Sequence, residues 1–344
     1  MERQITDPQL GSGPIASVFS SHATICTPAV LTIYIFTFLI GLPSNLLAFY
    51  TFLVKVRQKP TPVDILLLNL TISDLSLLIF LPFRMVEAIS DRAWTLPAFL
   101  CPLTSFFFYS SVYISCLFLM AVSIERYLGV AFPIKYKLWR RPAYATAASV
   151  VFWVVGCAHC SIVYIVQYQD QSQNRTAPFN NASHCYKDFS PTQLQSLLPV
   201  RLELFLVLFC LPFTVTIFCY VSFVRILVAL PNIPARRKQR AVGLVVATLC
   251  NFIVCFAPYN LSHVVGFVQN KSPSWRVYVL LLSTLNAALD PAIFYFSSTA
   301  VQRAFTKCLA GLWHKLSAFM KLKPEQPPEQ CRGLGGAQVC CSNL

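Results

Sequence analysis

Two arginines and two histidines fall within or beside long apolar segments, where charged side chains are uncommon. They are Arg201, Arg276, His159 and His263. Arginine carries a planar, permanently charged fork of N–H donors that matches a carboxylate, and histidine adds a donor in either protonation state. Because an ionisable residue inside a membrane is costly, it is by default a functional-site candidate. Four such donors near one membrane face predict a binding site for a small carboxylate.

Seven apolar segments recur along the chain, each long enough to cross the ~30 Å hydrocarbon core of a bilayer. Hydrophobic residues make up 56% of the chain and charged residues only 12%, which is unlike a soluble domain. Backbone groups in lipid must be satisfied within their own segment, so each segment is expected to be a helix. The segments cover about 28–54, 63–85, 101–130, 143–167, 197–229, 240–268 and 276–298.

The sequence therefore predicts an all-α membrane protein, a seven-transmembrane helix bundle with a short amphipathic cytoplasmic helix. The bundle is expected over 28–298, after an extracellular N-terminal segment, 1–27. Val301, Phe305, Leu309 and Leu312 alternate with cations at a spacing that suits an amphipathic helix over 299–313. The remaining cytoplasmic tail, 314–344, is rich in proline and glycine and is expected to be disordered.

The net charge of +14 is concentrated in alternate loops, which argues against a nucleic-acid partner. Cytoplasmic loops of membrane proteins carry an excess of Lys and Arg, so the N-terminus is expected outside and the C-terminus in the cytoplasm. The basic loops would also meet anionic lipid of the inner leaflet. The clusters are Lys55, Arg57 and Lys59; Lys135, Lys137, Arg140 and Arg141; and Arg236, Arg237, Lys238 and Arg240.

In this orientation odd-numbered helices run from outside to inside, which gathers the candidate donors near the extracellular face. Ligand binding is not the only interpretation of these residues. The arginine side chains can instead extend to the lipid headgroups, and the histidines can be ordinary packing residues. The tyrosines can equally be core aromatics, and Arg84 can equally form an ion pair with Glu87. The gathered residues are Arg201, Arg276, His159, His263, Tyr109, Tyr113 and Arg84.

Three of the fourteen cysteines, Cys26, Cys101 and Cys185, fall on the predicted extracellular side, where thiols oxidise. A disulfide between Cys101 and Cys185 would hold the 168–196 loop over the bundle. Cys26 would then have no disulfide partner on that side. Three N-glycosylation sequons agree with this orientation, although the pattern is weak by itself. They begin at Asn174, Asn181 and Asn270.

One landmark in each segment resembles the rhodopsin-like G-protein-coupled receptors. The resemblance covers about 30–310 and departs from the family at Phe256, Asp290 and Phe294, where most members have Trp, Asn and Tyr. The landmarks are Asn45, Asp74, Glu125-Arg126-Tyr127, Trp153, Pro212, Cys255-Phe256-Ala257-Pro258 and Asp290-Pro291.

Longer strings are similar to the free fatty acid receptors, in particular the short-chain types 2 and 3. They are SIERYLGVAFPIKYKL, LLPVRLEL, CFAPYNLSHVVGF and STLNAALDP. The resemblance implies a plasma-membrane receptor for acetate, propionate or butyrate, and not an enzyme. Its partners would be a heterotrimeric G protein, of the Gi/o type with Gq as a second route, and arrestin.

The resemblance also implies roles for individual residues. The positions of Arg201, Arg276, His263 and Tyr259 hold the ligand carboxylate in the family. Tyr164 is expected at the pocket floor, where type 2 has Ile and type 3 has Tyr, so the preferred chain length cannot be copied from either type.

At the cytoplasmic face, Glu125, Arg126 and Tyr127 would couple to the G protein, with Arg126 paired to Glu125 in the inactive state. In related receptors the positions of Asp74, Ser115, Asn286 and Asp290 bind sodium; a protonated carboxyl pair or a water network is the alternative. No other cofactor is expected.

Two other functions remain open from the residues alone. One is a receptor of the same architecture for another small carboxylate or a hydroxy-acid. The other is a carboxylate transporter, but internal repeats and helices broken at mid-bilayer, which transporters usually show, are not evident. An enzyme is disfavoured because no nucleophile–base set falls at one depth.

Overall fold

A computed structural model describes residues 14–90, 93–173, 185, 191–230 and 234–321. Within these residues the structure is helical and contains no strand. Seven helices are long and apolar enough to cross a membrane, which confirms the predicted fold class. These spans are Pro28–Gln58, Pro62–Ile89, Leu100–Ala131, Pro142–Ile162, Pro191–Ala229, Ala235–Gln269 and Arg276–Ser297.

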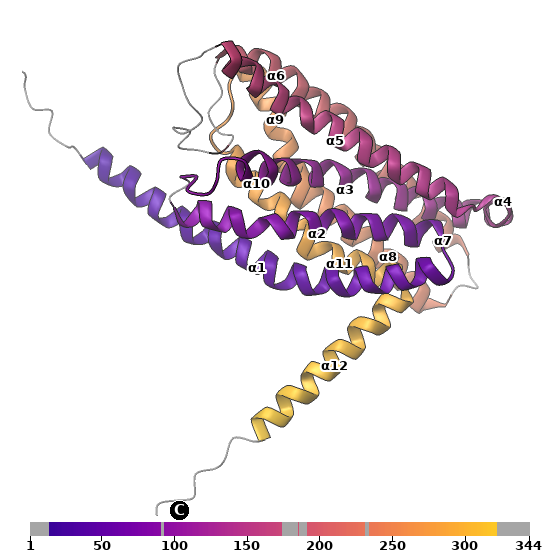
Figure 1. The fold of residues 1–344 in the computed structure, drawn as a ribbon. Helices are drawn as coiled ribbons and strands as arrows, with labels where there is room; N and C mark the ends of the chain where they lie inside the picture. Colours follow the sequence, from indigo (N-terminus) through magenta and orange to yellow (C-terminus); the bar gives the residue numbers. More distant parts are fainter. Residues whose placement is uncertain (1–13, 91–92, 174–184, 186–190, 231–233, 322–344) are drawn as a thin grey trace, which may run out of the picture. The chain divides into compact units, whose positions relative to one another are not determined.

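The first four spans belong to single helices that pack side by side (Figure 1). They are α1 (Pro14–Gln58), α2 (Pro62–Ile89), α3 (Leu100–Ala131) and α5 (Pro142–Gln173). Helix α2 begins with Thr61 as its cap, whose hydroxyl accepts a hydrogen bond from the backbone N–H of Asp64. A short helix that the sequence did not predict, α4 (Pro133–Trp139), follows α3.

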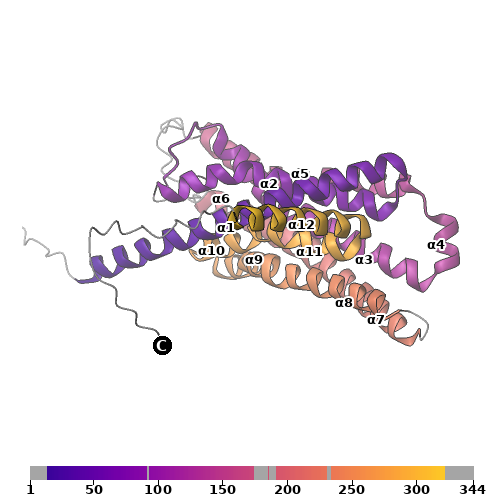
Figure 2. The same cartoon turned by 90° about the horizontal axis from the view of Figure 1, so that it is seen from below.

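The fifth and sixth spans each contain a π-helical segment that ends two residues before a proline. The fifth consists of α6 (Pro191–Glu203), η2 (Leu204–Cys210) and α7 (Leu211–Ala229), and the sixth of α8 (Ala235–Cys250), η3 (Asn251–Phe256) and α9 (Ala257–Gln269). Proline lacks a backbone N–H, so the preceding turns widen to re-pair their carbonyls. Figure 2 shows α8 and α9 as successive parts of one rod, with α10 and α11 beside it.

The seventh span is interrupted at Leu285, between α10 (Arg276–Thr284) and α11 (Asn286–Ser297). Here Asn45 of α1 donates a hydrogen bond to the carbonyl of Ala287 at 2.7 Å. Gly41, one turn earlier, lies so close to α11 that an added Cβ would be 3.1 Å from the Ala287 carbonyl oxygen. The absence of a side chain at Gly41 therefore allows α1 to approach the interrupted span.

Two predicted boundaries differ from the structure. Helix α1 begins at Pro14, inside the segment expected to precede the bundle, and α12 (Thr299–Lys321) continues beyond residue 313 into the expected disordered tail. The chain divides into two compact units, to Ala304 and from Phe305. In the second unit α12 exposes Leu309, Leu312 and Trp313, apolar side chains that suit a helix lying on a membrane.

Candidate ligand-binding site

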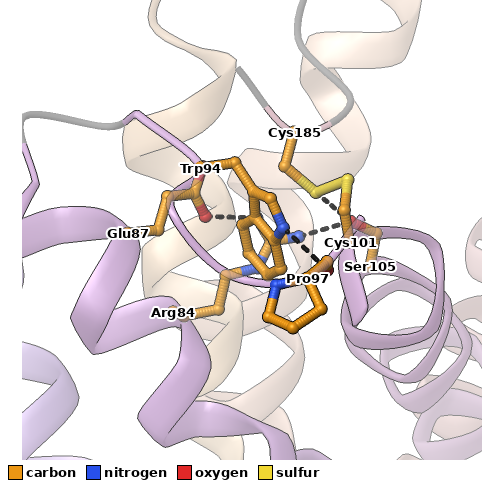
Figure 3. Close-up of a disulfide and its surroundings, with 7 residues drawn as sticks. All are labelled: Arg84, Glu87, Trp94, Pro97, Cys101, Ser105 and Cys185. Carbon is orange, nitrogen blue, oxygen red and sulfur yellow. Dashed lines mark hydrogen bonds and ion pairs between the residues drawn. A yellow bond between two sulfur atoms is a disulfide. The ribbon is translucent and has the colours of Figure 1, made fainter. Parts of the chain in front are cut away.

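A disulfide between Cys101 and Cys185 marks one end of the bundle, called here the disulfide end (Figure 3). Cys101 lies in the first turn of α3, and Cys185 comes from the connection between α5 and α6. Trp94 packs against the two cysteines and donates its indole N–H to the carbonyl of Pro97 at 3.2 Å. The bridge that the sequence suggested is therefore formed, and it holds Cys185 over the helix ends.

Arg84 and Glu87 form a buried ion pair beside this disulfide (Figure 3). The guanidinium of Arg84 lies 2.6 Å from the Glu87 carboxylate and donates a second hydrogen bond to Ser105 at 2.7 Å. It also lies 5.2 Å from the centre of the Phe108 ring. Arg84 was expected either to contribute to the ligand site or to pair with Glu87, and the structure shows the ion pair.

A small cavity of about 20 Å³ lies at the same end. Six of the predicted ligand residues meet in its walls, from α3, α6, α9 and α10. The lining residues are Tyr109, Tyr113, Cys160, Arg201, Leu204, Tyr259, His263 and Arg276.

Arg276 is held against two tyrosine rings in this cavity. It donates a hydrogen bond to the hydroxyl of Tyr259 at 2.7 Å, and its guanidinium carbon lies 5.2 Å from the Tyr259 ring centre and 5.9 Å from that of Tyr109. No carboxylate among the described residues forms an ion pair with it. The aromatic faces stabilise the cation and leave its charge available to an anion.

His263 is almost fully buried on the next turn of α9 after Tyr259. Its Nε2 atom hydrogen bonds the hydroxyl of Tyr113 at 2.8 Å, and its ring meets the Tyr259 ring edge-on. The other ring nitrogen, Nδ1, has no hydrogen-bond partner among the described residues. A buried polar atom without a partner costs free energy, so Nδ1 is a ready contact for a ligand.

Arg201 lies on the last turn of α6, directly before η2, and its side chain is 3% exposed. It donates a long hydrogen bond of 3.4 Å to the hydroxyl of Ser272. Because Arg201 and Arg276 line the same cavity, two like charges oppose each other in an apolar environment. An anion between them would relieve this repulsion.

His159 and Tyr164, the other two predicted ligand residues, are not among the described residues that line the cavity. His159 pairs instead with Glu203 of α6 at 3.0 Å and contacts the carbonyl of Val155. Tyr164 packs beside the disulfide and against the ring of Phe106. Both side chains thus contact other neighbours in this structure, and their role in ligand binding stays a prediction.

Three residues at this site could not be recognised from the sequence. Cys160 and Leu204 line the cavity, but each reads as an ordinary apolar position of its helix. Ser272 contacts Arg201 from the short connection between α9 and α10. The position of Ser272 in that connection, four residues before Arg276, was the one feature of the sequence that could have indicated its place at the site.

A larger cavity of about 340 Å³, called here the vestibule, shares Tyr109 and Arg276 with the small one. Its walls come from α1, α2, α3, α10, the connection before α10 and Cys185. The lining residues are Val30, Tyr34, Arg84, Glu87, Ala88, Tyr109, Cys185, Ser272, Pro273, Ser274, Arg276, Val277, Leu280 and Leu281.

At the opposite end of the bundle, Arg126 is not paired with Glu125. Its guanidinium donates to the carbonyl of Ser297 at 2.9 Å, and Glu125 instead accepts a hydrogen bond from Tyr136 of α4. Burial and this hydrogen bond to Glu125 raise the pKa of Tyr136, so the phenol stays protonated and donates at neutral pH. Tyr127 packs against Phe218 of α7. In this structure Arg126 and Glu125 thus contact α11 and α4 rather than each other, and the pairing predicted for the inactive state stays a prediction.

A second polar cluster lies in the middle of the bundle. Asp290 accepts a hydrogen bond from Asn251, and the Asn286 amide lies 3.5 Å from the hydroxyl of Ser115. The carboxyl groups of Asp74 and Asp290 are in contact with each other, and apart from that contact both oxygens of Asp74 and Oδ2 of Asp290 are buried without a hydrogen-bond donor among the described residues. This set of oxygens resembles the environment that a small hard cation requires.

Of the three sequons, only the one at Asn270 lies within the described residues. Asn270 is exposed and ends α9 in the left-handed conformation, with φ 51°. Asn174 and Asn181 lie outside the described residues.

Residues 44–294 match the model of the seven-transmembrane receptors of the rhodopsin family. The chain is 56% identical to free fatty acid receptor 2 of Mus musculus over 312 residues, which cover 90% of this chain and 94% of that receptor. It is 49% identical to free fatty acid receptor 3 of Mus musculus over 308 residues, covering 87% and 95%. The corresponding identity with free fatty acid receptor 2 of Rattus norvegicus is 53% over 312 residues, covering 90% and 94%.

Proposed function

The chain belongs to the rhodopsin family of seven-transmembrane receptors and, within it, to the free fatty acid receptors, and we propose that short-chain fatty acids activate it. Acetate, propionate and butyrate are the proposed ligands, and heterotrimeric G proteins the partners. The chain is a multi-pass receptor of the plasma membrane and not an enzyme.

The observation that carries the ligand proposal is Arg276, a cation held beside two tyrosine rings with no carboxylate partner among the described residues. A carboxylate beside it would accept hydrogen bonds from its guanidinium and from Nδ1 of His263, which already line one cavity. The ligand thereby satisfies buried donors and neutralises charge in one step.

We also propose that the disulfide end faces the outside of the cell. Disulfides persist in oxidising compartments, and the bridge lies at the start of α3. The basic clusters near Lys55, Arg140 and Arg237 lie at the opposite helix ends, where the positive-inside rule places the cytoplasm. Asn270, exposed beyond α9, is then accessible to glycosylation.

Ligand size limits the affinity of such a site. The best very small ligands gain about 1.5 kcal/mol per heavy atom, which for acetate corresponds to a dissociation constant of roughly 40 μM at best. The receptor is therefore expected to respond at tens of micromolar to millimolar concentrations.

The proposal is tested by dose–response curves for straight-chain carboxylates from formate to octanoate in cells that express the chain. Addition of a short-chain acid should lower cyclic AMP in these cells while the amount of receptor at the cell surface stays the same. Lactate and 3-hydroxybutyrate distinguish the hydroxy-acid alternative, and uptake of labelled acetate by proteoliposomes would indicate a transporter. A panel in which no short-chain acid changes any G-protein signal would contradict the proposal.

Signalling is proposed to run through the end that carries Arg126. A Gi/o-type G protein is the proposed main partner, with Gq as a second route and arrestin as a later one. The contact of Arg126 with the α11 carbonyl at Ser297 ties the end of α3 to the seventh span, which also carries Arg276. A ligand that moves α10 and α11 can therefore change the surface offered to a G protein.

We further propose a structural sodium ion held by Asp74 and Asp290, with Ser115 and Asn286 beside them. The buried contact between the two carboxyl groups supports this assignment, because a cation would offset their burial and mutual repulsion; a proton shared by the pair is the alternative. When bound, sodium supplies positive charge only, and the protein supplies the oxygens.

Sodium is expected to raise the thermal unfolding temperature of the purified receptor relative to equal choline chloride. At about a hundred times its dissociation constant, a ligand stabilises the folded state by roughly 2.7 kcal/mol. Asp74→Asn should abolish the difference between the two salts. An equal response of wild type and Asp74→Asn to sodium would rule the site out.

A further inference from the structure

An ion pair between His159 and Glu203 joins α5 to α6 beside the small cavity. The Nε2 atom of His159 lies 3.0 Å from a carboxylate oxygen of Glu203, and its Nδ1 atom lies 2.8 Å from the carbonyl oxygen of Val155, one turn earlier. Cys160, the residue after His159, lines the cavity. The two side chains are 28% and 40% exposed, so neither group is sealed inside the bundle.

The contacts of the imidazole determine how many protons the pair holds. A carbonyl oxygen only accepts hydrogen bonds, so Nδ1 carries a hydrogen and donates it to Val155. An ionised carboxylate also only accepts, so the contact of Nε2 with Glu203 requires one further proton, either on the imidazole or on the carboxyl group. The pair with this proton has no net charge. Its loss leaves a lone pair of Nε2 against a carboxylate and a net charge of one negative unit.

This charge is coupled to the small cavity through α6. Glu203 follows Arg201 by two residues on the last turn of that helix, and Arg201 lines the cavity with Arg276. With the proton bound, the charge of Glu203 is compensated. Without it, an uncompensated carboxylate lies on the turn that carries Arg201 and repels an anionic ligand. Unit charges about 10 Å apart, at an effective dielectric constant of about 20, change a binding constant by up to roughly tenfold.

Other ionisable groups at the disulfide end come from the helices packed against α5, which are α2, α3 and α6. Among the described residues, Glu203 is the acid that pairs with His159, and the acid and base of α2 already pair with each other. The described groups are Arg201 and Glu203 of α6, Tyr109 and Tyr113 of α3, Arg84 and Glu87 of α2, and Cys157, Cys160 and Tyr164 of α5 itself.

We propose that the His159–Glu203 pair makes the receptor sensitive to protons. With its proton, the pair joins α6 to α5 and leaves the positive field of the cavity undiminished; without it, carboxylate ligands bind more weakly. Histidine is the side chain that ordinarily changes charge between pH 5 and 8, whereas small carboxylic acids are almost fully ionised above about pH 6. The response to a given acid therefore increases as the external medium is acidified. This inference rests on the proposed function and adds a regulation to it.

The test replaces each partner by glutamine, which forms hydrogen bonds but does not titrate. His159→Gln leaves Glu203 as a charged carboxylate at every pH, and Glu203→Gln removes that charge. His314→Gln makes the same change at an exposed histidine of α12 and is the matched control. Dose–response curves for propionate are recorded at external pH values of about 6, 7 and 8 and at equal surface expression. Unfolding temperatures of the purified receptors without ligand, at the same pH values, report on the pair apart from signalling.

Wild type and His314→Gln should be about fivefold less potent at pH 8 than at pH 6. His159→Gln should show the weaker potency at every pH, and Glu203→Gln at pH 8 should match wild type at pH 6. Because the folded pair holds a proton that the separated side chains release, its stabilisation is present at low pH and lost as the pH rises. The unfolding temperature should therefore fall between pH 6 and 8 more in wild type than in either pair variant.

The inference is overturned if the potency of propionate on wild type is independent of pH or if His159→Gln keeps the wild-type pH dependence. It is also overturned if the unfolding temperatures of wild type and of both pair variants follow the same pH profile. A wild type that responds to no acid at any pH would refute the proposed function. The unfolding temperatures would in that case still decide whether the pair carries the proton.

Discussion

Arg276→Ala and Arg201→Ala are each expected to abolish the response to short-chain acids while surface expression persists. Hydrogen bonds to charged groups contribute about 1.5–3 kcal/mol, so losing one guanidinium corresponds to roughly 10- to 100-fold in potency. Since the ligands start at tens of micromolar or weaker, such a loss moves the response beyond usable concentrations. Arg201→Lys should also fail largely, because an ammonium retains the charge but not the planar fork.

Lys271→Ala is the matched control for this experiment. Lys271 is an exposed cation at the disulfide end, in the connection that carries Ser272. It is not among the described residues that line either cavity. It should respond as wild type does. Should either arginine variant keep the wild-type half-maximal concentration for every acid from acetate to pentanoate, the anchor has been misassigned.

The second large effect is expected from Glu87→Ala. Arg84 is 7% exposed and Glu87 is 6% exposed, so this variant leaves a buried cation without its carboxylate. Breaking such a pair from one side typically costs about 3–5 kcal/mol of folding free energy. The variant should therefore unfold at a clearly lower temperature in detergent and reach the cell surface poorly.

Replacing both partners together separates lost charge from lost packing. Arg84→Met with Glu87→Leu removes both charges, and buried pairs exchanged for apolar residues of similar volume are often neutral or stabilising. The double variant should therefore unfold near the wild-type temperature. Equal destabilisation of the single and double variants would mean that packing against Phe108 and Ser105, rather than charge, stabilises this end of the bundle.

The membrane-spanning architecture could be predicted from the sequence because it depends on local properties. Span length follows from the run of apolar residues that a bilayer requires, and helix form follows from backbone hydrogen bonding in lipid. The depth of Arg201, Arg276 and His263 then follows from counting along each helix. Depth alone placed these residues at one end, and the structure brings them into one cavity.

The direction in which a side chain points could not be predicted in the same way. The π-helical segments η2 and η3 interrupt the regular 3.6-residue period directly after Arg201 and before Tyr259, so the phase of each helix depends on how its proline is accommodated. His159 lies at a similar predicted depth to Arg201 but turns to Glu203. A partner from another helix decided that outcome.

The sequence by itself determined the number of spans, the residues available for chemistry and their depth, because hydrophobic length and charge are carried by each segment separately. Only the tertiary structure decided which charges were already satisfied. Packing paired Arg84 with Glu87 and His159 with Glu203, and it left Arg276 beside Tyr109 and Tyr259 without a carboxylate partner among the described residues. Pairing requires contact between side chains from separate parts of the fold or a specific local rotamer, and neither is fixed by the order of residues along one segment.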